Sequence, residues 1–181
     1  MKTPIRSLVV LFVLLASLSA PLFAVGSEYS QALGVQGGRL AGVGISYQRW
    51  LDDFGYQVAG GLIYHPEMEY GDDELVYNIG LELQYPLVYH EANSWLAGML
   101  YLVGGVHHQG YKKAEFVSDL DVYRSGPLTL NIGIGGGVGV ESIFFKHFAI
   151  STEFVYVGMY EITSSTFVVD MYPQVSLRYR F

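Results

Sequence analysis

The sequence predicts an all-β fold: an eight-stranded, antiparallel, up-and-down transmembrane β-barrel. Three observations predict it. Apolar residues recur at every second position through most of the chain, which is the period of a β-strand with one face in an apolar environment. The connections between these runs alternate between short and long. The last run ends in an aromatic residue, Phe181. The composition agrees, because 15 tyrosines and 22 glycines accompany only 15% charged residues among 181.

The first residues predict export. Lys2 and Arg6 precede the apolar run Leu8–Ala16, and small residues follow that run, as in a secretory signal peptide. We therefore expect a signal peptide over residues 1–24 and an outer-membrane β-barrel domain over residues 25–181. The alternative is an uncleaved membrane helix over residues 7–24, which is disfavoured because its apolar core is short and the segment is interrupted by serines and Pro21.

Composition restricts the ways in which the exported chain can be attached to a membrane or inserted in it. The absence of cysteine excludes both a disulfide framework and a lipid-modified N-terminal cysteine. No later run has the roughly 18 uncharged apolar residues of a membrane helix, so a closed barrel is the remaining structure that satisfies its backbone in lipid. The net charge of -7, which becomes -9 when Lys2 and Arg6 are removed, disfavours nucleic acid as a partner.

The first strands differ in how clearly their faces separate. Tyr29–Gln36 is the weakest, because only a short glycine connection separates it from the next strand, at about Arg39–Trp50. Phe54–Tyr64 places Tyr56, Val58, Leu62 and Tyr64 opposite Gln57, Ala59 and Gly61. Ser94–His108 is apolar on both faces, so its pattern does not indicate which face points inward.

The strand expected over Glu74–Tyr89 has the longest clear alternation. Every second residue from Leu75 to Tyr89 is apolar and uncharged. The opposite face carries Glu74, Asn78, Glu82 and Gln84. We therefore predict that the first face is directed outward and the second into the barrel.

A glycine-rich run, Asn131–Val140 with the sequence NIGIGGGVGV, lies inside the strand expected over Pro127–Glu141. The G-x-G-x-x-G spacing of a dinucleotide-binding loop is not met, and no Gly-Lys-Ser/Thr occurs in the chain. Apolar residues instead alternate with glycine, which indicates a strand. We expect the inward glycines to leave room for Arg178, Tyr172 or other bulky groups, or for a narrow cavity.

Phe148–Tyr160 and Asp170–Phe181 complete the set of strands. In the last strand Val175, Leu177, Tyr179 and Phe181 share an apolar face. This strand resembles the final strand of small bacterial outer-membrane β-barrels, such as those of OmpA transmembrane-domain or OmpW-like architecture, which ends in an aromatic residue. The resemblance implies that these four residues form the signal bound by the outer-membrane assembly machinery.

The connections and the aromatic residues predict how the barrel is oriented. From the second strand onward, short connections over residues 51–55, 90–94 and 144–147 alternate with long ones over residues 65–74, 110–127 and 161–170. Short turns are periplasmic and long loops external in such barrels. Aromatic residues are expected in a girdle at each membrane interface. The periplasmic girdle comprises Trp50, Phe54, Tyr56, Tyr89, Trp95, Phe144, Phe148, Tyr179 and Phe181, and the outer girdle Tyr64, Tyr77, Tyr101, Tyr156, Tyr160 and Tyr172.

The charged residues of the strands are expected inside the barrel, because an Arg or Lys facing lipid at mid-depth costs about 2 to 4 kcal/mol. The predicted luminal polar network comprises Asn78, Glu82, Gln84, Asn131, Glu141, Glu153, Arg178 and Arg180. Its simpler interpretation is charge satisfaction in a sealed interior, and the alternative is a gate for small solutes. A soluble, lipocalin-like barrel with its apolar face inside remains the alternative fold.

No motif in the sequence indicates an enzyme, a cofactor or a metal site. The lipid A deacylase pattern, which places serine two residues after histidine, is absent. A site built from His107 with Asp119 or Asp121 and Ser118 or Ser125 remains a remote alternative. His107 and His108 are neighbours on a strand, so they point to opposite faces, which argues against a shared metal site.

The expected function is therefore structural or adhesive, through the outer loops. Outer-membrane lipid, the assembly machinery and a surface ligand are the expected partners. The alternative is a narrow channel or binding barrel for a small, hydrophobic solute. The acidic residues Glu67, Glu69, Asp72, Asp73 and Glu74 form a solvated loop or bridge divalent cations at lipid head groups.

Overall fold

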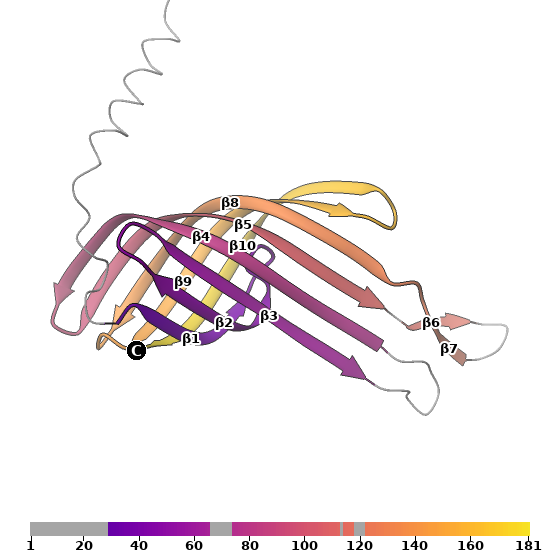
Figure 1. Ribbon diagram of the computed structural model, residues 1–181, viewed down its shortest axis with the longest axis horizontal. Coiled ribbons are helices and arrows are strands. Elements are labelled where there is room, and N and C mark those ends of the chain that lie inside the picture. Colours follow the sequence, from indigo (N-terminus) through magenta and orange to yellow (C-terminus); the bar gives the residue numbers. More distant parts are fainter. Residues whose placement is uncertain (1–28, 66–73, 113, 118–121) are drawn as a thin grey trace, which may run out of the picture.

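The computed structural model describes residues 29–65, 74–112, 114–117 and 122–181, whose strands close a barrel (Figure 1). Eight strands follow one another around the closed sheet in the order β1, β10, β9, β8, β5, β4, β3, β2, and every neighbouring pair is antiparallel. The predicted fold class is confirmed. The barrel strands are β1 (Gln31–Gly37), β2 (Val43–Trp50), β3 (Gly55–His65), β4 (Glu74–Asn93), β5 (Leu96–Lys112), β8 (Thr129–Phe144), β9 (Phe148–Glu161) and β10 (Thr166–Arg180).

The barrel has two unlike ends, which we name by their connections. The turn end holds residues 51–54, 94–95 and 145–147 and the C-terminus. The loop end holds the β1–β2 connection and the β9–β10 turn, with a small hairpin of β6 (Ala114–Val117) and β7 (Val122–Ser125) beyond it (Figure 1). Among the described residues, no helix has the length and apolar character needed to cross a membrane.

One predicted long connection is wrong. β9 continues to Glu161 and β10 begins at Thr166, so residues 162–165 form a tight turn in place of a loop over 161–170. Ser165 adopts a φ of 54° there, and the residues after it are aromatic or β-branched and favour a strand. The predicted longest connection does contain the β6–β7 hairpin, whose presence the sequence did not suggest.

A β-bulge overturns the predicted orientation of one aromatic residue. The register between β4 and β5 shifts between Pro86 and Val88, and the extra residue reverses the alternation beyond it. Val88 therefore faces outward, whereas Tyr89, expected in the periplasmic girdle, packs against buried residues. Trp50 and Tyr101 also lie inside the barrel, because Trp50 shares the inward parity of β2 and Tyr101 that of β5.

The polarity of the barrel is inverted relative to a soluble protein. Alternate residues of β10, such as Val175 and Leu177, are exposed on the outside, whereas their neighbours Gln174 and Ser176 are buried inside. Large apolar side chains cover the outer surface of every barrel strand. The lipocalin-like alternative is wrong, because it requires the apolar face inside.

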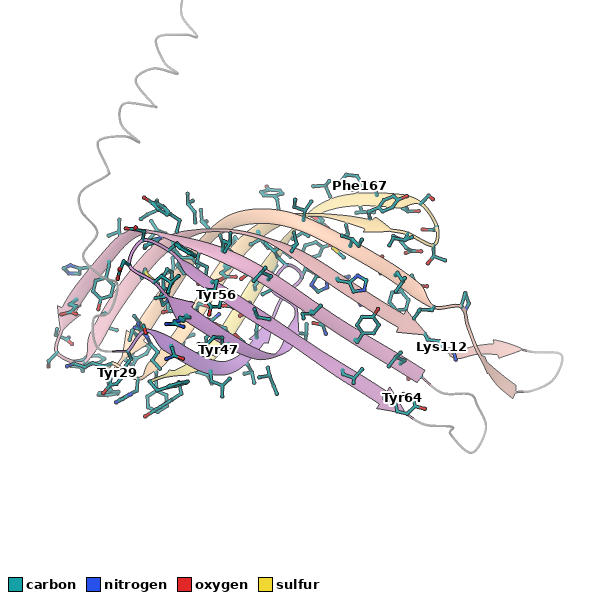
Figure 2. The ribbon with its side chains drawn as sticks, viewed as in Figure 1. Tyr29, Tyr47, Tyr56, Tyr64, Lys112 and Phe167 are labelled. Atoms are coloured by element: carbon teal, nitrogen blue, oxygen red, sulfur yellow. The ribbon has the colours of Figure 1, made fainter. Side chains whose placement is uncertain are left out.

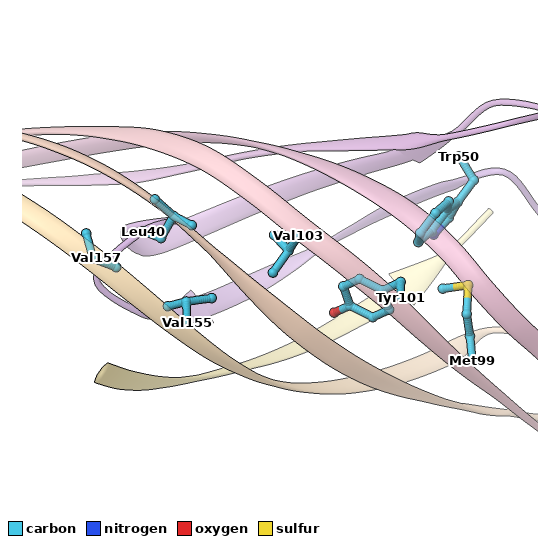
Figure 3. Close-up of a cluster of buried hydrophobic side chains, with 7 residues drawn as sticks. All are labelled: Leu40, Trp50, Met99, Tyr101, Val103, Val155 and Val157. Carbon is cyan, nitrogen blue, oxygen red and sulfur yellow. The ribbon is translucent and has the colours of Figure 1, made fainter. Parts of the chain in front are cut away.

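Apolar side chains do fill part of the interior. Leu40, Trp50, Met99, Tyr101, Val103, Val155 and Val157 form a buried cluster (Figure 3). In Figure 3, Leu40 and Val157 lie at one end of this cluster and Trp50 and Met99 at the other. The ring of Tyr101 lies against Gly139 of β8, where any side chain would collide with it. At Gly139 the missing side chain makes room for a bulky luminal group, and that group is Tyr101, not Arg178 or Tyr172.

The β1–β2 connection folds into the barrel, and we call residues 38–42 the inserted loop. Leu40 and Ala41 are 0% and 1% exposed. The chain leaves the interior through Gly42 at a φ of 101°, a conformation that favours glycine. The sequence predicted that this connection is short and that the second strand begins at about Arg39; the second expectation is wrong, because β2 begins at Val43.

Candidate functional site: the barrel interior

Arg178 organises the polar residues nearest the turn end. Its guanidinium donates hydrogen bonds to Glu141 Oε2 (3.1 Å), Ser46 Oγ (3.2 Å), Gln36 Oε1 (3.0 Å) and Gln57 Oε1. The pair with Glu141 is an ion pair whose two side chains are fully buried. These partners lie on four different strands, so one side chain ties β10 to β1, β2, β3 and β8.

Gln174 organises a second group, on the loop-end side of Arg178. Its amide nitrogen donates to Glu82 Oε1 (2.8 Å) and Glu153 Oε2 (2.7 Å). Its oxygen accepts the backbone N–H groups of Leu40 (2.7 Å) and Ala41 (3.0 Å). All four hydrogen-bonding positions of this amide are therefore occupied. Gln174 therefore links the inserted loop to Glu82 and Glu153 through hydrogen bonds.

Gln84 joins these groups into one network, and Tyr101 extends it. The hydroxyl of Tyr101, labelled in Figure 3, donates to Glu153 Oε1 at 2.6 Å. Gln84 Nε2 lies 3.4 Å from both Gln57 Oε1 and Glu153 Oε1, and its own oxygen accepts from Gln48 Nε2 at 2.8 Å. The network is continuous around the lumen.

The network carries more negative than positive groups. Glu82, Glu141 and Glu153 are each 0% exposed, and Arg178 forms an ion pair with Glu141. One oxygen of Glu82 and one of Glu141 are buried without a hydrogen-bond partner in the described part of the chain. Because buried carboxylates are costly without partners, the few contacts they do make are important for stability.

Five predicted luminal residues join this network, and three do not. Glu82, Gln84, Glu141, Glu153 and Arg178 are in it. Asn78 instead binds both backbone groups of Val43, beside the inserted loop. Asn131 lies at the loop end. Arg180 lies at the turn end, where it donates to the carbonyl of Tyr29 at 2.7 Å.

Most of the buried amide side chains were not among the predicted luminal residues. Gln36, Gln48, Gln57 and Gln174 are buried members of the network, with Ser46 and Tyr101. The signal was available, since each glutamine has the inward parity of its strand. Only the pairing of residues that lie up to 142 positions apart in the sequence required the structure.

Two cavities lie at opposite ends of this packed interior. A cavity of about 430 Å³ at the turn end is lined by Tyr29, Tyr89, Glu91, Asn93, Ser94, Trp95, Leu96, Ala97, Ile143, Lys146 and Arg180. A cavity of about 390 Å³ at the loop end is lined by Arg39, Val76, Gln109, Tyr111, Asn131, Met159, Glu161, Thr166, Val168 and Tyr172. The two share no lining residue, and the polar network and the inserted loop lie between them.

The residues predicted to form an assembly signal share the outer face of β10 and the C-terminus. Val175, Leu177, Tyr179 and Phe181 are each about half exposed, at 52%, 53%, 47% and 49%. Tyr179 stacks on His147 and meets Phe148 edge to face.

The alternative catalytic and metal-binding residues are only partly described. His107 is buried and faces inward, and His108 faces outward against Tyr77, as predicted from their parity. Ser118, Asp119 and Asp121 lie outside the described residues, as do Glu67, Glu69, Asp72 and Asp73, and the side chain of Ser125 is not described either. Within the described part of the chain, no group of three His, Cys, Asp or Glu residues is placed to hold a metal ion.

Comparisons with known proteins add one structural likeness. The chain is similar in structure to the N-terminal β-barrel domain of Pseudomonas aeruginosa OprF, with a TM-score of 0.48 and 16% sequence identity over 83% of this chain and 96% of that one. No protein-family model matches the sequence, and no curated protein matches it significantly.

Proposed function

We propose that this protein is an integral β-barrel of a bacterial outer membrane, with a closed lumen and a structural or surface-interaction role. The inverted polarity of the barrel carries this proposal. Glu82, Glu153 and Arg178 are buried at 0 to 1% exposure, while Leu62, Ile134 and Val175 on the outside are 52 to 68% exposed. In water this arrangement exposes apolar surface far beyond that of a soluble monomer, whereas in lipid it satisfies both faces.

The dimensions of the apolar surface support the same proposal. Tyr56 and Tyr64 face outward near opposite ends of β3, eight residues apart (Figure 2). At the usual strand rise and tilt they are separated by about 20 Å along the barrel axis, close to the roughly 25 Å apolar band of outer-membrane barrels. Tyrosine favours membrane interfaces, so these two residues are placed to mark the two surfaces.

The closed lumen favours a structural role over passage of solutes. The polar network and the inserted loop separate the two cavities, and an eight-stranded barrel is only wide enough for its own side chains. Contact with a surface partner would then fall to the loop end, where the β6–β7 hairpin extends beyond the barrel (Figure 1). The proposed role is not enzymatic and uses no cofactor.

Heat-modifiable migration and membrane partition test this proposal. The full chain is expressed in a Gram-negative host, and outer-membrane fractions are run on a gel with and without boiling. We expect the protein in the outer membrane, migrating faster when it is not boiled, because a closed barrel resists detergent until heated. Equal migration in both lanes together with recovery in the aqueous fraction would contradict the proposal.

A further inference from the structure

We propose that the loop-end cavity binds a single-chain amphiphile with an anionic head group, which enters sideways from the membrane between β3 and β10. This inference rests on the proposed insertion of the barrel in a membrane. The occupant is bound above a closed lumen, so the site is a binding site and not a passage. Four observations support it: a gap in the barrel wall, apolar residues along the gap, a cavity behind it, and an arginine in that cavity.

The gap exists because β1 and β2 are short. They have 7 and 8 residues, fewer than the roughly 9 to 11 that a tilted strand needs to cross a membrane. β2 pairs with β3 only as far as Gly60, and β1 pairs with β10 only as far as Val175. Beyond those points Gly61–His65 and Thr166–Gln174 pair on one side only, with β4 and β9. Figure 1 shows β3, β4 and β5 extending well past the β1–β2 connection.

The edges of the gap are apolar at the depth where lipid chains are expected. On β3, Leu62 faces outward at 68% exposure and Ile63 faces the lumen at 56%. On β10, Met171 faces outward at 48% and Val168 faces the lumen at 52%. Leu62 precedes Tyr64, the interface marker of the same strand, so the gap begins below the membrane surface. Apolar residues on both faces of both edges are unusual for strands that border only water.

The gap opens onto the loop-end cavity. The walls of this cavity come from β4, β5, β8, β9 and β10, and the missing sector is where β1 and β2 have ended. Val76, Met159 and Val168 supply apolar lining, and Ile63 is the register partner of Val76. Unpaired strand edges are tolerated at membrane depth where they line a cavity, and the unpaired edges of β3 and β10 border this cavity. The volume of about 390 Å³ lies in the range of small-molecule sites and fits one acyl chain better than a multi-chain lipid.

Arg39 determines the preferred head group. It is exposed, it extends from the inserted loop, and its Nη1 donates to Gln109 Oε1 at 3.1 Å. Its guanidinium lies 5.6 Å from the centre of the Tyr172 ring. Both partners are uncharged, so no carboxylate of the described residues is paired with this cation, which retains donors for an anion. Glu161 also lines the cavity, as the last residue of β9, and its carboxylate weakens the binding of an anion there.

Binding of head-group variants to the folded barrel tests this site. The protein is reconstituted in phosphatidylcholine nanodiscs, and dodecanoate, dodecanol and dodecylamine compete for a fluorescent fatty acid. We expect dodecanoate to compete best, and Arg39→Gln to weaken it by about fivefold or more while leaving dodecanol unchanged. Arg49→Gln is the matched control, because Arg49 is an exposed arginine near the turn end of β2, remote from the cavity. Glu161→Gln is expected to strengthen dodecanoate binding.

Photocrosslinking distinguishes the cavity from the surrounding lipid. A fatty acid with a diazirine in its chain is expected to label the peptides containing Ile63, Val76 and Val168 in excess over the outward face of β8. Uniform labelling of the outer surface, or equal competition by the three head groups, would overturn the proposal. Labelling at Ile63 and Val168 that is insensitive to Arg39→Gln would also overturn the anionic assignment. Crosslinks between two chains at these edges would assign them to a second copy.

These experiments distinguish a failure of the proposed membrane barrel from a failure of the amphiphile site alone. If the wild-type protein is not heat-modifiable and does not enter nanodiscs, the membrane barrel itself is wrong. If the wild type and both arginine variants are heat-modifiable but bind dodecanoate and dodecanol equally, only the amphiphile site is wrong.

Discussion

Arg178 is the residue on which the charged interior depends most. Its guanidinium binds Glu141, Ser46, Gln36 and Gln57, and both members of its ion pair with Glu141 are fully buried. Replacing a buried pair by apolar residues is often harmless, but removing one partner leaves the other charge uncompensated. The loss of Arg178 should therefore cost much more than the loss of an exposed arginine.

We predict that Arg178→Gln lowers the free energy of unfolding by about 3 to 5 kcal/mol. Urea titration in lipid vesicles, followed by the fluorescence of Trp50 and Trp95, measures the change. Arg49→Gln is the control and should change stability by less than about 0.5 kcal/mol, because Arg49 is exposed. The double replacement with Glu141→Gln should recover part of the loss. Equal stabilities of the two arginine variants would show that the ion pair contributes nothing.

The inward glycines provide a second test at this scale. A Cβ at Gly135 would collide with the carbonyl oxygen of Tyr156 and lie 3.0 Å from the Cα of Val157. We predict that Gly135→Ala destabilises the barrel by about 1 to 3 kcal/mol in the same titration. Gly98→Ala is the control, because nothing lies within 4 Å of a Cβ there. If both variants unfold at the same urea concentration, the wall between β8 and β9 is looser than the structure indicates.

At the scale of residues, the sequence predicted which face of a strand each side chain occupies, but it did not predict which other residues that side chain contacts. Alternation placed Glu82, Glu141, Glu153 and Arg178 inside, because each shares a face with polar or glycine residues. It failed for Tyr89, since a bulge adds a residue without any clear mark in the sequence. The choice of Glu141 as the ion-pair partner of Arg178 depends on how eight strands close, which local patterns do not encode.

Among the elements, the inserted loop has its buried backbone amides bound by the side chain of Gln174. Gln174 accepts both the Leu40 and the Ala41 amide. We predict that Gln174→Ala speeds hydrogen exchange of these two amides by at least about tenfold, while the β1–β10 ladder stays protected. Ser176→Ala, two residues along the same buried face, should leave them unchanged because Ser176 bonds Ser151 instead. Unchanged exchange in Gln174→Ala would mean that packing alone holds the loop.

In the last strand, a role in the assembly signal can be distinguished from a role in the stability of the folded barrel. Phe181 is 49% exposed, so Phe181→Ser should change the urea midpoint of the purified barrel only slightly. If Phe181 belongs to the assembly signal, the same change should lower the amount of heat-modifiable protein in the outer membrane of expressing cells several-fold. Phe148→Ser is the control, since Phe148 is a similarly exposed aromatic residue, at 51%, on the neighbouring strand. An equal loss in both variants would argue against a signal.

The sequence predicted which strands are present more reliably than it predicted where each strand begins and ends. All eight expected strands are present, including the weakest at Gln31–Gly37. Alternation could not show that β9 and β10 continue to a tight turn, because Thr166–Val169 is exposed on both faces and lacks a polar partner face. It also could not show that the short first connection turns inward, since that depends on Gln174, more than 130 residues away.

For the whole molecule, the main question is whether the lumen conducts. The two cavities do not meet, and Leu40, Gln174 and the carboxylates of Glu82 and Glu153 occupy the space between them. A passage for even a small solute would need the inserted loop to leave the lumen, and the polar network would then face water. Charge satisfaction in a closed interior is the interpretation that this packing supports.

We therefore predict that neither the wild-type barrel nor Glu153→Ala conducts in planar bilayers, because removing one carboxylate leaves the inserted loop in place. A variant in which residues 38–42 are replaced by a tight Asn-Gly turn should instead show small, cation-preferring currents, since Glu82, Glu141 and Glu153 outnumber Arg178 in the opened lumen. Each variant must first be heat-modifiable, so that a leak is not confused with misfolding. Steady conductance in the wild type would reinstate the channel, and silence in the loop replacement would place the seal in the polar network itself.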